Sequence, residues 1–147
     1  MFKLGDVMDC QKARNLNPIV LAFVGDAVYS LFVRERLTFE SDLKTGELNV
    51  LATSQVNASA QSSFIKEIID LLTEDELSIF KRARNAKKTT RAKHASVADY
   101  NMATGFEAVL GYLYLIGNLE RLNFILNKGI KDEGWRKKCR LWTIKNG

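Results

Sequence analysis

Two stretches of the chain are apolar on nearly every side of a helix, and they define its centre. The first starts at Asn17 and Pro18, an N-cap followed by a favoured first helical residue, and predicts a helix over about 18–37. The second has a start signal at Ser96 and continues through YNMATGFEAVLGYLYLIG until Gly117 ends it. Helices that are apolar all round lie in the middle of a protein or against a partner subunit.

The other segments predict shorter helices. Apolar residues recur at helical spacing over 42–72, which indicates two helices or one bent helix. Thr73 and Glu76 form a capping box that predicts a helix over about 74–83, and a further helix is expected around 119–128. No strand and no internal repeat is predicted, so the expected fold class is all-α, a helical bundle.

Length and composition favour one compact unit. The chain has 147 residues, of which 46% are apolar and only one is proline, and this suits a single domain over 1–147 with a substantial core. No apolar run is long enough for a membrane span, and the start MFKLGDVMDC lacks the layout of a secretory signal. We therefore expect a soluble, cytoplasmic protein.

Each of the two apolar helices contains one conspicuous acid, Asp26 in AFVGDAVY and Glu107 in TGFEAVLG. An ionised carboxylate removed from water is costly unless it is paired, hydrogen-bonded or bound to a metal. A cation is therefore expected nearby if both acids are buried. The residues one helical turn away are small and predict a hollow beside the acids: Ala22, Ser30, Ala103, Thr104 and Gly111.

If the two helices pack together, Asp26 and Glu107 line a pocket suited to Mg²⁺, whose shell combines one or two carboxylates with waters and substrate phosphate. Such an ion favours phosphodiester hydrolysis, because it lowers the pKa of a bound water, orients it and stabilises charge on the leaving oxygen. Another interpretation stays open, since an acid in an apolar helix is often at a solvent-facing edge or paired with an arginine. The two acids alone do not identify an enzyme.

Positive charge is concentrated in residues 81–94. The chain as a whole has 22 Lys and Arg against 17 Asp and Glu, a modest net charge of +5, but this segment contains no acid. It lacks aromatic residues for stacking on bases, which favours backbone contact with a nucleic-acid duplex, and a solvated loop is the alternative. The candidate binding residues are Lys81, Arg82, Arg84, Asn85, Lys87, Lys88, Arg91, Lys93 and His94.

These residues together resemble the catalytic domain of the ribonuclease III family, in which an FLGD-type helix and a later EALIG-type helix present the metal-binding acids. Here the two motifs read FVGD at 23–26 and EAVLG at 107–111. The segments KRARNAK at 81–87 and YNMATGFEAVLGYLYL at 100–115 are similar to those of Mini-ribonuclease III, a short bacterial subgroup.

The resemblance covers about 16–128 and implies an all-α homodimer in which each subunit supplies one active site to a shared valley for double-stranded RNA. It implies Mg²⁺ as cofactor, with Mn²⁺ as a substitute, and no appended double-stranded-RNA-binding domain. In the subgroup it implies trimming of the stem formed by the ends of the 23S ribosomal RNA precursor, where a ribosomal protein could remodel the RNA. The first helix independently favours a dimer, because it has more apolar positions than one small domain readily buries, such as Ile19, Val20, Phe23 and Val24.

The chain also departs from the full-length family, which carries further acids where this chain has Ile19, Ala22 and Thr104. Only Asp26 and Glu107 are carried over as catalytic, metal-binding residues, and the number of metal ions stays open.

The hypothesis is a magnesium-dependent endoribonuclease of double-stranded RNA. Its rivals are a non-catalytic RNA-binding or ribosome-assembly module on the same fold, and a purely structural helical dimer. The tail 131–147 is basic and contains two tryptophans, so it forms either a last amphipathic helix or an arm that contacts RNA.

Overall fold

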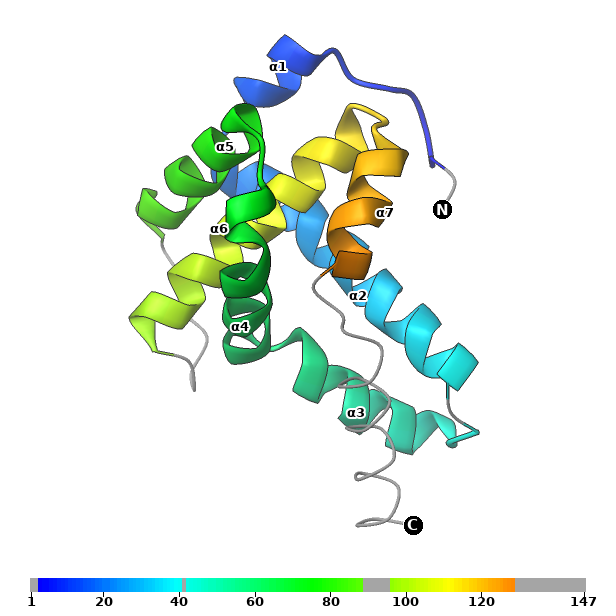
Figure 1. Cartoon of the computed structure of the whole chain (residues 1–147). Coiled ribbons are helices and arrows are strands. Elements are labelled where there is room, and N and C mark those ends of the chain that lie inside the picture. The colour runs from blue at the N-terminus through cyan, green and yellow to red at the C-terminus, as the bar shows by residue number, and fades with distance from the viewer. Residues whose placement is uncertain (1–2, 41, 89–95, 129–147) are drawn as a thin grey trace.

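Helices α2 (Pro18–Glu40) and α6 (Val97–Leu115) pack against each other through the middle of the molecule, with further helices around them (Figure 1). A computed structural model describes residues 3–40, 42–88 and 96–128. All regular structure within these three segments is helical, which confirms the predicted all-α class. The remaining elements are α1 (Cys10–Arg14), α3 (Thr45–Val56), α4 (Ala58–Ile68), the 3-10 helix η1 (Ile69–Leu71), α5 (Glu74–Asn85) and α7 (Leu119–Lys128).

Side chains at the predicted start signals cap the helices. At the start of α2, the Asn17 Oδ1 accepts a hydrogen bond from the backbone N–H two residues later, at 2.9 Å. At α5, the Thr73 N–H donates to Glu76 Oε1 at 2.9 Å, and the Glu76 N–H donates to the Thr73 hydroxyl at 3.2 Å. At the start of α6, the Ser96 hydroxyl accepts a hydrogen bond from the Asp99 N–H at 3.1 Å. The predicted starts of these three helices are confirmed.

Two helices extend beyond their predicted ends. Helix α2 continues to Glu40 and α5 to Asn85, so the helix includes Arg84 and Asn85 of the basic segment 81–94 as well. Over 42–72 the chain forms two helices, α3 and α4, rather than one bent helix. The break is at Asn57, whose ψ of 162° is extended and whose side chain accepts a hydrogen bond from the Ala60 N–H at 2.9 Å.

The N-terminal segment forms a helix that the sequence analysis did not predict. Asp9 caps α1 by accepting hydrogen bonds from the next turn, and the Met8 N–H donates to the Leu115 carbonyl oxygen at 2.8 Å. Gly117 ends α6 as predicted, with a φ of 74° that favours glycine. Because a Cβ at Gly117 would press on Val7, the N-terminal segment lies against this turn.

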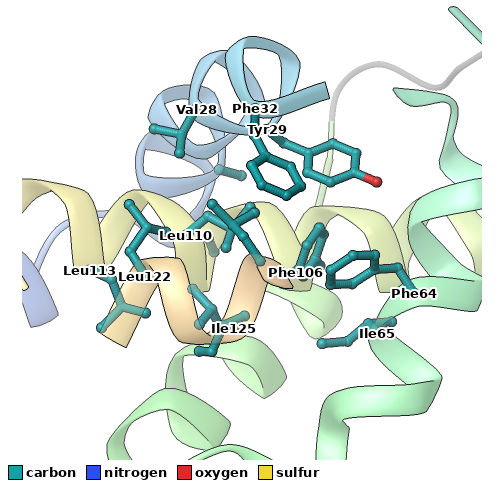
Figure 2. Close-up of a cluster of buried hydrophobic side chains, with 14 of the residues drawn as sticks. Val28, Tyr29, Phe32, Phe64, Ile65, Phe106, Leu110, Leu113, Leu122 and Ile125 are labelled. Carbon is teal, nitrogen blue, oxygen red and sulfur yellow. The ribbon is translucent and has the colours of Figure 1, made fainter. Parts of the chain in front are cut away.

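The core is centred on α6 (Figure 2). Phe106 is fully buried, and its ring meets those of Tyr29 from α2 and Phe64 from α4 at centroid distances of 5.3 and 4.9 Å. Leu122 and Ile125 of α7 join the same cluster. The prediction that the second apolar helix lies in the middle of the protein is confirmed.

Helix α2 buries only one of its sides within the chain. Leu21 and Val33 face the core, whereas Phe23 is 79% exposed and Val20 and Leu31 are also exposed. Such an exposed apolar face is the feature expected of a helix that meets a partner. Among the residues that the structure describes, no helix combines the length and apolarity needed to cross a membrane.

Candidate active site

Two glycines bring the backbones of α2 and α6 into contact. A Cβ added at Gly25 would overlap the carbonyl oxygen of Glu107, and one added at Gly111 would overlap the carbonyl oxygen of Leu21. Only glycine permits this approach, because every other residue carries a Cβ. The contact places Asp26, the residue after Gly25, beside the segment of α6 that contains Glu107.

The two acids interact electrostatically but differ in burial. Asp26 is exposed, whereas Glu107 is partly buried. Burial, and to a smaller extent the negative charge of Asp26, together raise the pKa of Glu107 to about 8, while a hydrogen bond from the Gln61 side chain opposes the shift. Asp26 is therefore at a solvent-facing edge, the alternative that the sequence left open, because the open side of α2 leaves it in contact with solvent.

The hollow predicted beside the acids stays a prediction. Ala22, Ala103 and Thr104 are buried, and their small side chains allow α2 and α6 to pack closely. The Thr104 hydroxyl donates to the carbonyl oxygen of Tyr100 at 2.8 Å, within α6. Small residues therefore bring the acids together by shortening the distance between helices.

The donor set fits a magnesium ion. The side chains that act on the Glu107 pKa are Asp26 and Gln61, and neither supplies positive charge. Across the described segments, no three His, Cys, Asp or Glu residues cluster into a metal-binding group, so the site offers two carboxylates. One or two carboxylates completed by waters and phosphate are typical of Mg²⁺, whereas a structural zinc site needs four nitrogen or sulfur ligands.

Gln61 of α4 belongs to this site, although the sequence analysis did not identify it. Its side chain is 1% exposed and forms a hydrogen bond that acts on Glu107. A signal was present, because Gln61 lies on the same helical stripe as the buried Phe64, Ile65 and Ile68. A lone amide on an apolar stripe indicates a buried polar contact.

The basic candidates extend from the last turns of α5 into the segment that follows. Lys81 and Lys87 are exposed, and Arg84 donates from its Nε to Asn85 Oδ1 at 3.2 Å and lies over the Phe80 ring. The structure brings these residues to one end of α5. Arg91, Lys93 and His94, and the tail 131–147, lie outside the described residues.

Two basic candidates are already engaged within the protein. Arg82 donates to the carbonyl oxygens of Arg14 and Leu16 at 2.7 and 3.4 Å, which ties α5 to the turn between α1 and α2. Lys88 donates from Nζ to the carbonyl oxygens of Arg84 and Ala86 at 3.0 and 2.9 Å, and burial lowers its pKa. These contacts satisfy carbonyls near the C-terminal end of α5 and of the α1 turn.

The helical fold and the glycine-lined crossing define a ribonuclease III domain. The family model described as "Ribonuclease III domain" matches residues 19–118, a range that includes both acids. A crystal structure of a protein from Fusobacterium nucleatum is similar, with a TM-score of 0.72 and 36% identity, over 82% of this chain and 96% of that one.

Similar proteins of known name show to which group of this family the chain belongs. A protein of Clostridium tetani named "Mini-ribonuclease 3" is 47% identical over 124 residues, which are 84% of this chain and 82% of the relative. A protein of the same name from Thermoanaerobacter sp. is 45% identical over 117 residues, 80% of this chain and 82% of the relative. The chain therefore belongs to the Mini-ribonuclease III group of the ribonuclease III family, and it is an endoribonuclease. The resemblance stated from the FVGD and EAVLG motifs is confirmed.

Proposed function

We propose that this endoribonuclease cleaves double-stranded RNA with Mg²⁺ as its cofactor, and that Asp26 and Glu107 are the catalytic residues that hold the ion. The observation that supports the proposal is the pairing of these two acids where Gly25 and Gly111 bring α2 and α6 together. Mn²⁺ is an expected substitute, because it accepts the same oxygen ligands.

Glu107 acts as a ligand only after it loses a proton. Its pKa of about 8 leaves the carboxyl group largely protonated at neutral pH in the free protein, so loss of this proton accompanies metal binding. When bound, Mg²⁺ supplies an acidified water for attack on the phosphodiester and stabilises charge on the leaving oxygen. Asp26, exposed beside Glu107, adds the second negative charge that attracts the cation. Gly25 and Gly111 keep the two carboxylates in register.

The RNA backbone is bound by the basic segment. Lys81 and Lys87 are exposed and able to reach phosphate, and Arg91, Lys93 and His94 continue the same run of sequence. Arg82 and Lys88 contribute mainly by fixing the end of α5, since their nitrogens donate to backbone carbonyls. With few phosphate contacts, affinity should be moderate and should fall as salt rises.

A second copy of the chain covers the exposed face of α2. Val20, Phe23, Ala27 and Leu31 are exposed and recur at helical spacing, so they form one apolar stripe on a helix that also carries Asp26. A two-fold dimer pairs such a stripe with its own copy. Because Asp26 borders the stripe, dimerisation would place the two active sites close to one interface.

The proposed natural substrate is the double-stranded stem formed by the ends of the 23S ribosomal RNA precursor, which would place the reaction in the cytoplasm. Membership of the Mini-ribonuclease III group supports this proposal. A ribosomal protein that remodels the stem is the proposed partner, because the described basic residues offer few phosphate contacts. Cleavage of the precursor stem, compared with a random duplex of equal length, measures this preference.

The decisive experiment replaces each acid by its amide. Asp26→Asn and Glu107→Gln should each reduce cleavage of a duplex RNA in Mg²⁺ by about a hundredfold or more while the protein still binds the duplex. Glu35→Gln, an exposed acid on the same helix as Asp26, is the matched control and should cleave normally.

The outcomes separate the rivals. Undiminished cleavage by a folded Asp26→Asn or Glu107→Gln protein removes that residue from the mechanism. If the unaltered protein binds duplex RNA but does not cleave it in Mg²⁺ or Mn²⁺, the rival of a non-catalytic RNA-binding module gains support. Failure to bind duplex RNA at moderate salt favours the structural dimer.

A further inference from the structure

Gln61 reaches the active site from a third helix. It lies in the first turns of α4, a helix that packs against α6, and its side chain is 1% exposed. An uncharged residue buried this deeply beside the acid pair is absent from the catalytic set proposed above. Its role is therefore open.

The amide of Gln61 has one contact with the backbone and one with the acid pair. Nε2 donates to the carbonyl oxygen of Val56 at 2.8 Å, and a hydrogen bond from the side chain lowers the pKa of Glu107. An amide NH₂ group has two protons, so it can donate to both oxygens. The contact with Val56 limits the rotation of the amide.

The oxygen of the same amide has no partner. Oε1 of Gln61 is buried, and within the described residues no donor reaches it. Buried carbonyl oxygens are nearly always hydrogen-bonded, so an orphan of this kind needs an explanation such as a water or ion. Once Glu107 has lost its proton to bind a metal, it has no proton to give to this oxygen, and a water then supplies the missing donor.

We propose that Gln61 is a positioning residue of the metal site: its nitrogen orients Glu107, and its oxygen accepts a hydrogen bond from a water of the cation's shell. The inference rests on the proposed function, because it requires that Asp26 and Glu107 hold a divalent ion. Mutation of a residue that orients a metal's ligands typically costs about 10- to 100-fold in metal affinity or activity.

The composition of the site explains why a neutral residue suits this position. The negative charge of Asp26 already acts on Glu107, and within the described segments no third acid, histidine or cysteine joins them in a metal-binding group. A third acid at position 61 would add repulsion before the cation arrives, whereas an amide adds an oxygen without charge. Ile19, Ala22 and Thr104 offer no such oxygen, because two are apolar and the Thr104 hydroxyl bonds within α6.

The experiment measures Mg²⁺ binding by the RNA-free protein with isothermal titration calorimetry. Gln61→Leu removes both the nitrogen and the oxygen, and should weaken Mg²⁺ binding about tenfold. Gln61→Glu keeps an oxygen at the orphan position but loses the nitrogen, so its Mg²⁺ affinity should fall less than that of Gln61→Leu. Ser62→Ala is the matched control, because Ser62 is the next residue, is 1% exposed and also has a buried unpartnered oxygen, but does not act on Glu107.

Chemical unfolding in EDTA, measured in parallel, separates positioning from general stability. A purely structural Gln61 would lower stability in both Gln61 variants and leave Mg²⁺ affinity unchanged in both, which would overturn the proposal. Equal weakening by Gln61→Leu and Gln61→Glu would also overturn the role of the oxygen. Should Gln61→Leu fail to fold, Gln61→Met preserves the length without polar atoms and takes its place.

Failure of this inference is distinguishable from failure of the proposed function. If the unaltered protein, Ser62→Ala and Gln61→Leu all bind Mg²⁺ and cleave RNA equally well, only the proposed role of Gln61 is refuted. If the unaltered protein binds neither Mg²⁺ nor Mn²⁺, the metal-dependent function falls and the inference falls with it.

Discussion

The crossing of α2 and α6 and the basic end of α5 both carry charged residues that stand out in the sequence, but they are built differently. At the crossing the backbones meet through Gly25 and Gly111, so helix packing sets the positions of the acids. At the end of α5 the charges are at the ends of long side chains, and some already bond to the protein: Arg82 and Lys88 donate to backbone carbonyls.

This difference shows which side chains the fold holds in place before a ligand binds. Asp26 has a short side chain and Glu107 is partly buried, so the positions of both carboxylates depend closely on how the two helices pack. A lysine or arginine has a long stem and can bond to a carbonyl of its own chain or to phosphate. Cleavage should therefore depend on how the helices pack. RNA affinity should depend on which lysine and arginine side chains are not already bonded to the protein itself.

The largest effect is expected where packing sets the site. Gly25→Ala should lower the free energy of unfolding by about 3 kcal/mol or more, because its Cβ would overlap backbone atoms of Glu107 that cannot move aside cheaply. Cleavage should be lost as well, since the two acids would separate. Urea unfolding followed by circular dichroism measures the first effect.

Gly46→Ala provides the control for this change. Gly46 is also helical, in α3, but nothing lies near the added methyl group. This substitution should stabilise the protein by up to about 1 kcal/mol, through helix propensity and the unfolded state. Equal effects of the two substitutions would show that the crossing does not depend on the Gly25 contact.

Most of the fold could be predicted because its signals are local. Asn17, Thr73 and Ser96 cap helices through bonds to residues two or three positions away, so the sequence alone marks those starts. Helix α1 was missed because it has five residues and depends on a long-range bond from Met8 to Leu115. Helix ends such as that of α5 were less predictable, since no glycine or proline marks them.

The site was predictable only in part. The two acids stood out because each is isolated in an apolar helix, but the burial of Glu107 and the exposure of Asp26 depend on which side of each helix faces the core. The position of Gln61 on the apolar stripe of α4 indicates a buried polar contact, but the sequence does not reveal that this contact is with Glu107. The sequence also could not show which basic residues are available to bind RNA, since charge alone does not reveal that Arg82 bonds to the α1 turn.

The second prediction concerns the pH dependence of stability at the crossing. The pKa of Glu107 is about 8 in the folded protein, against an ordinary value of 4.5. Between these values the folded state retains a proton that the unfolded state has lost, so stability should fall as pH rises, by up to about 1.4 kcal/mol per pH unit. Above pH 8 the loss should level off.

Glu107→Gln should remove this slope, because glutamine does not titrate. In EDTA the variant should therefore be more stable than the unaltered protein at pH 8 and similar to it near pH 4.5. Addition of Mg²⁺ should stabilise the unaltered protein at pH 8 more than the variant. Parallel unfolding curves for the two proteins from pH 5 to 9 would contradict the burial of this acid beside Asp26.

A third prediction tests whether the exposed side of α2 is a dimer interface. Phe23→Lys should weaken self-association by about tenfold or more, because it places charge in the centre of the proposed apolar stripe. Phe39→Lys is the matched control on the same helix, since Phe39 is 81% exposed and Phe23 79%. Analytical ultracentrifugation over a range of concentrations compares them, and a monomer in the unaltered protein would refute the interface.

The smallest effects are expected at the end of α5. There, some substitutions should affect RNA binding and others the stability of the fold. The double variant Lys81→Ala with Lys87→Ala should reduce the slope of log affinity for duplex RNA against log salt by up to about 2, at nearly unchanged stability. Arg82→Ala should instead lower the unfolding free energy by about 1 kcal/mol, because two backbone carbonyls lose their donor, and should leave the slope unchanged. A reduced salt slope with unchanged stability in Arg82→Ala would mean that Arg82 leaves the α1 turn to bind RNA. The end of α5 would then contribute to RNA binding more than the side-chain contacts indicate.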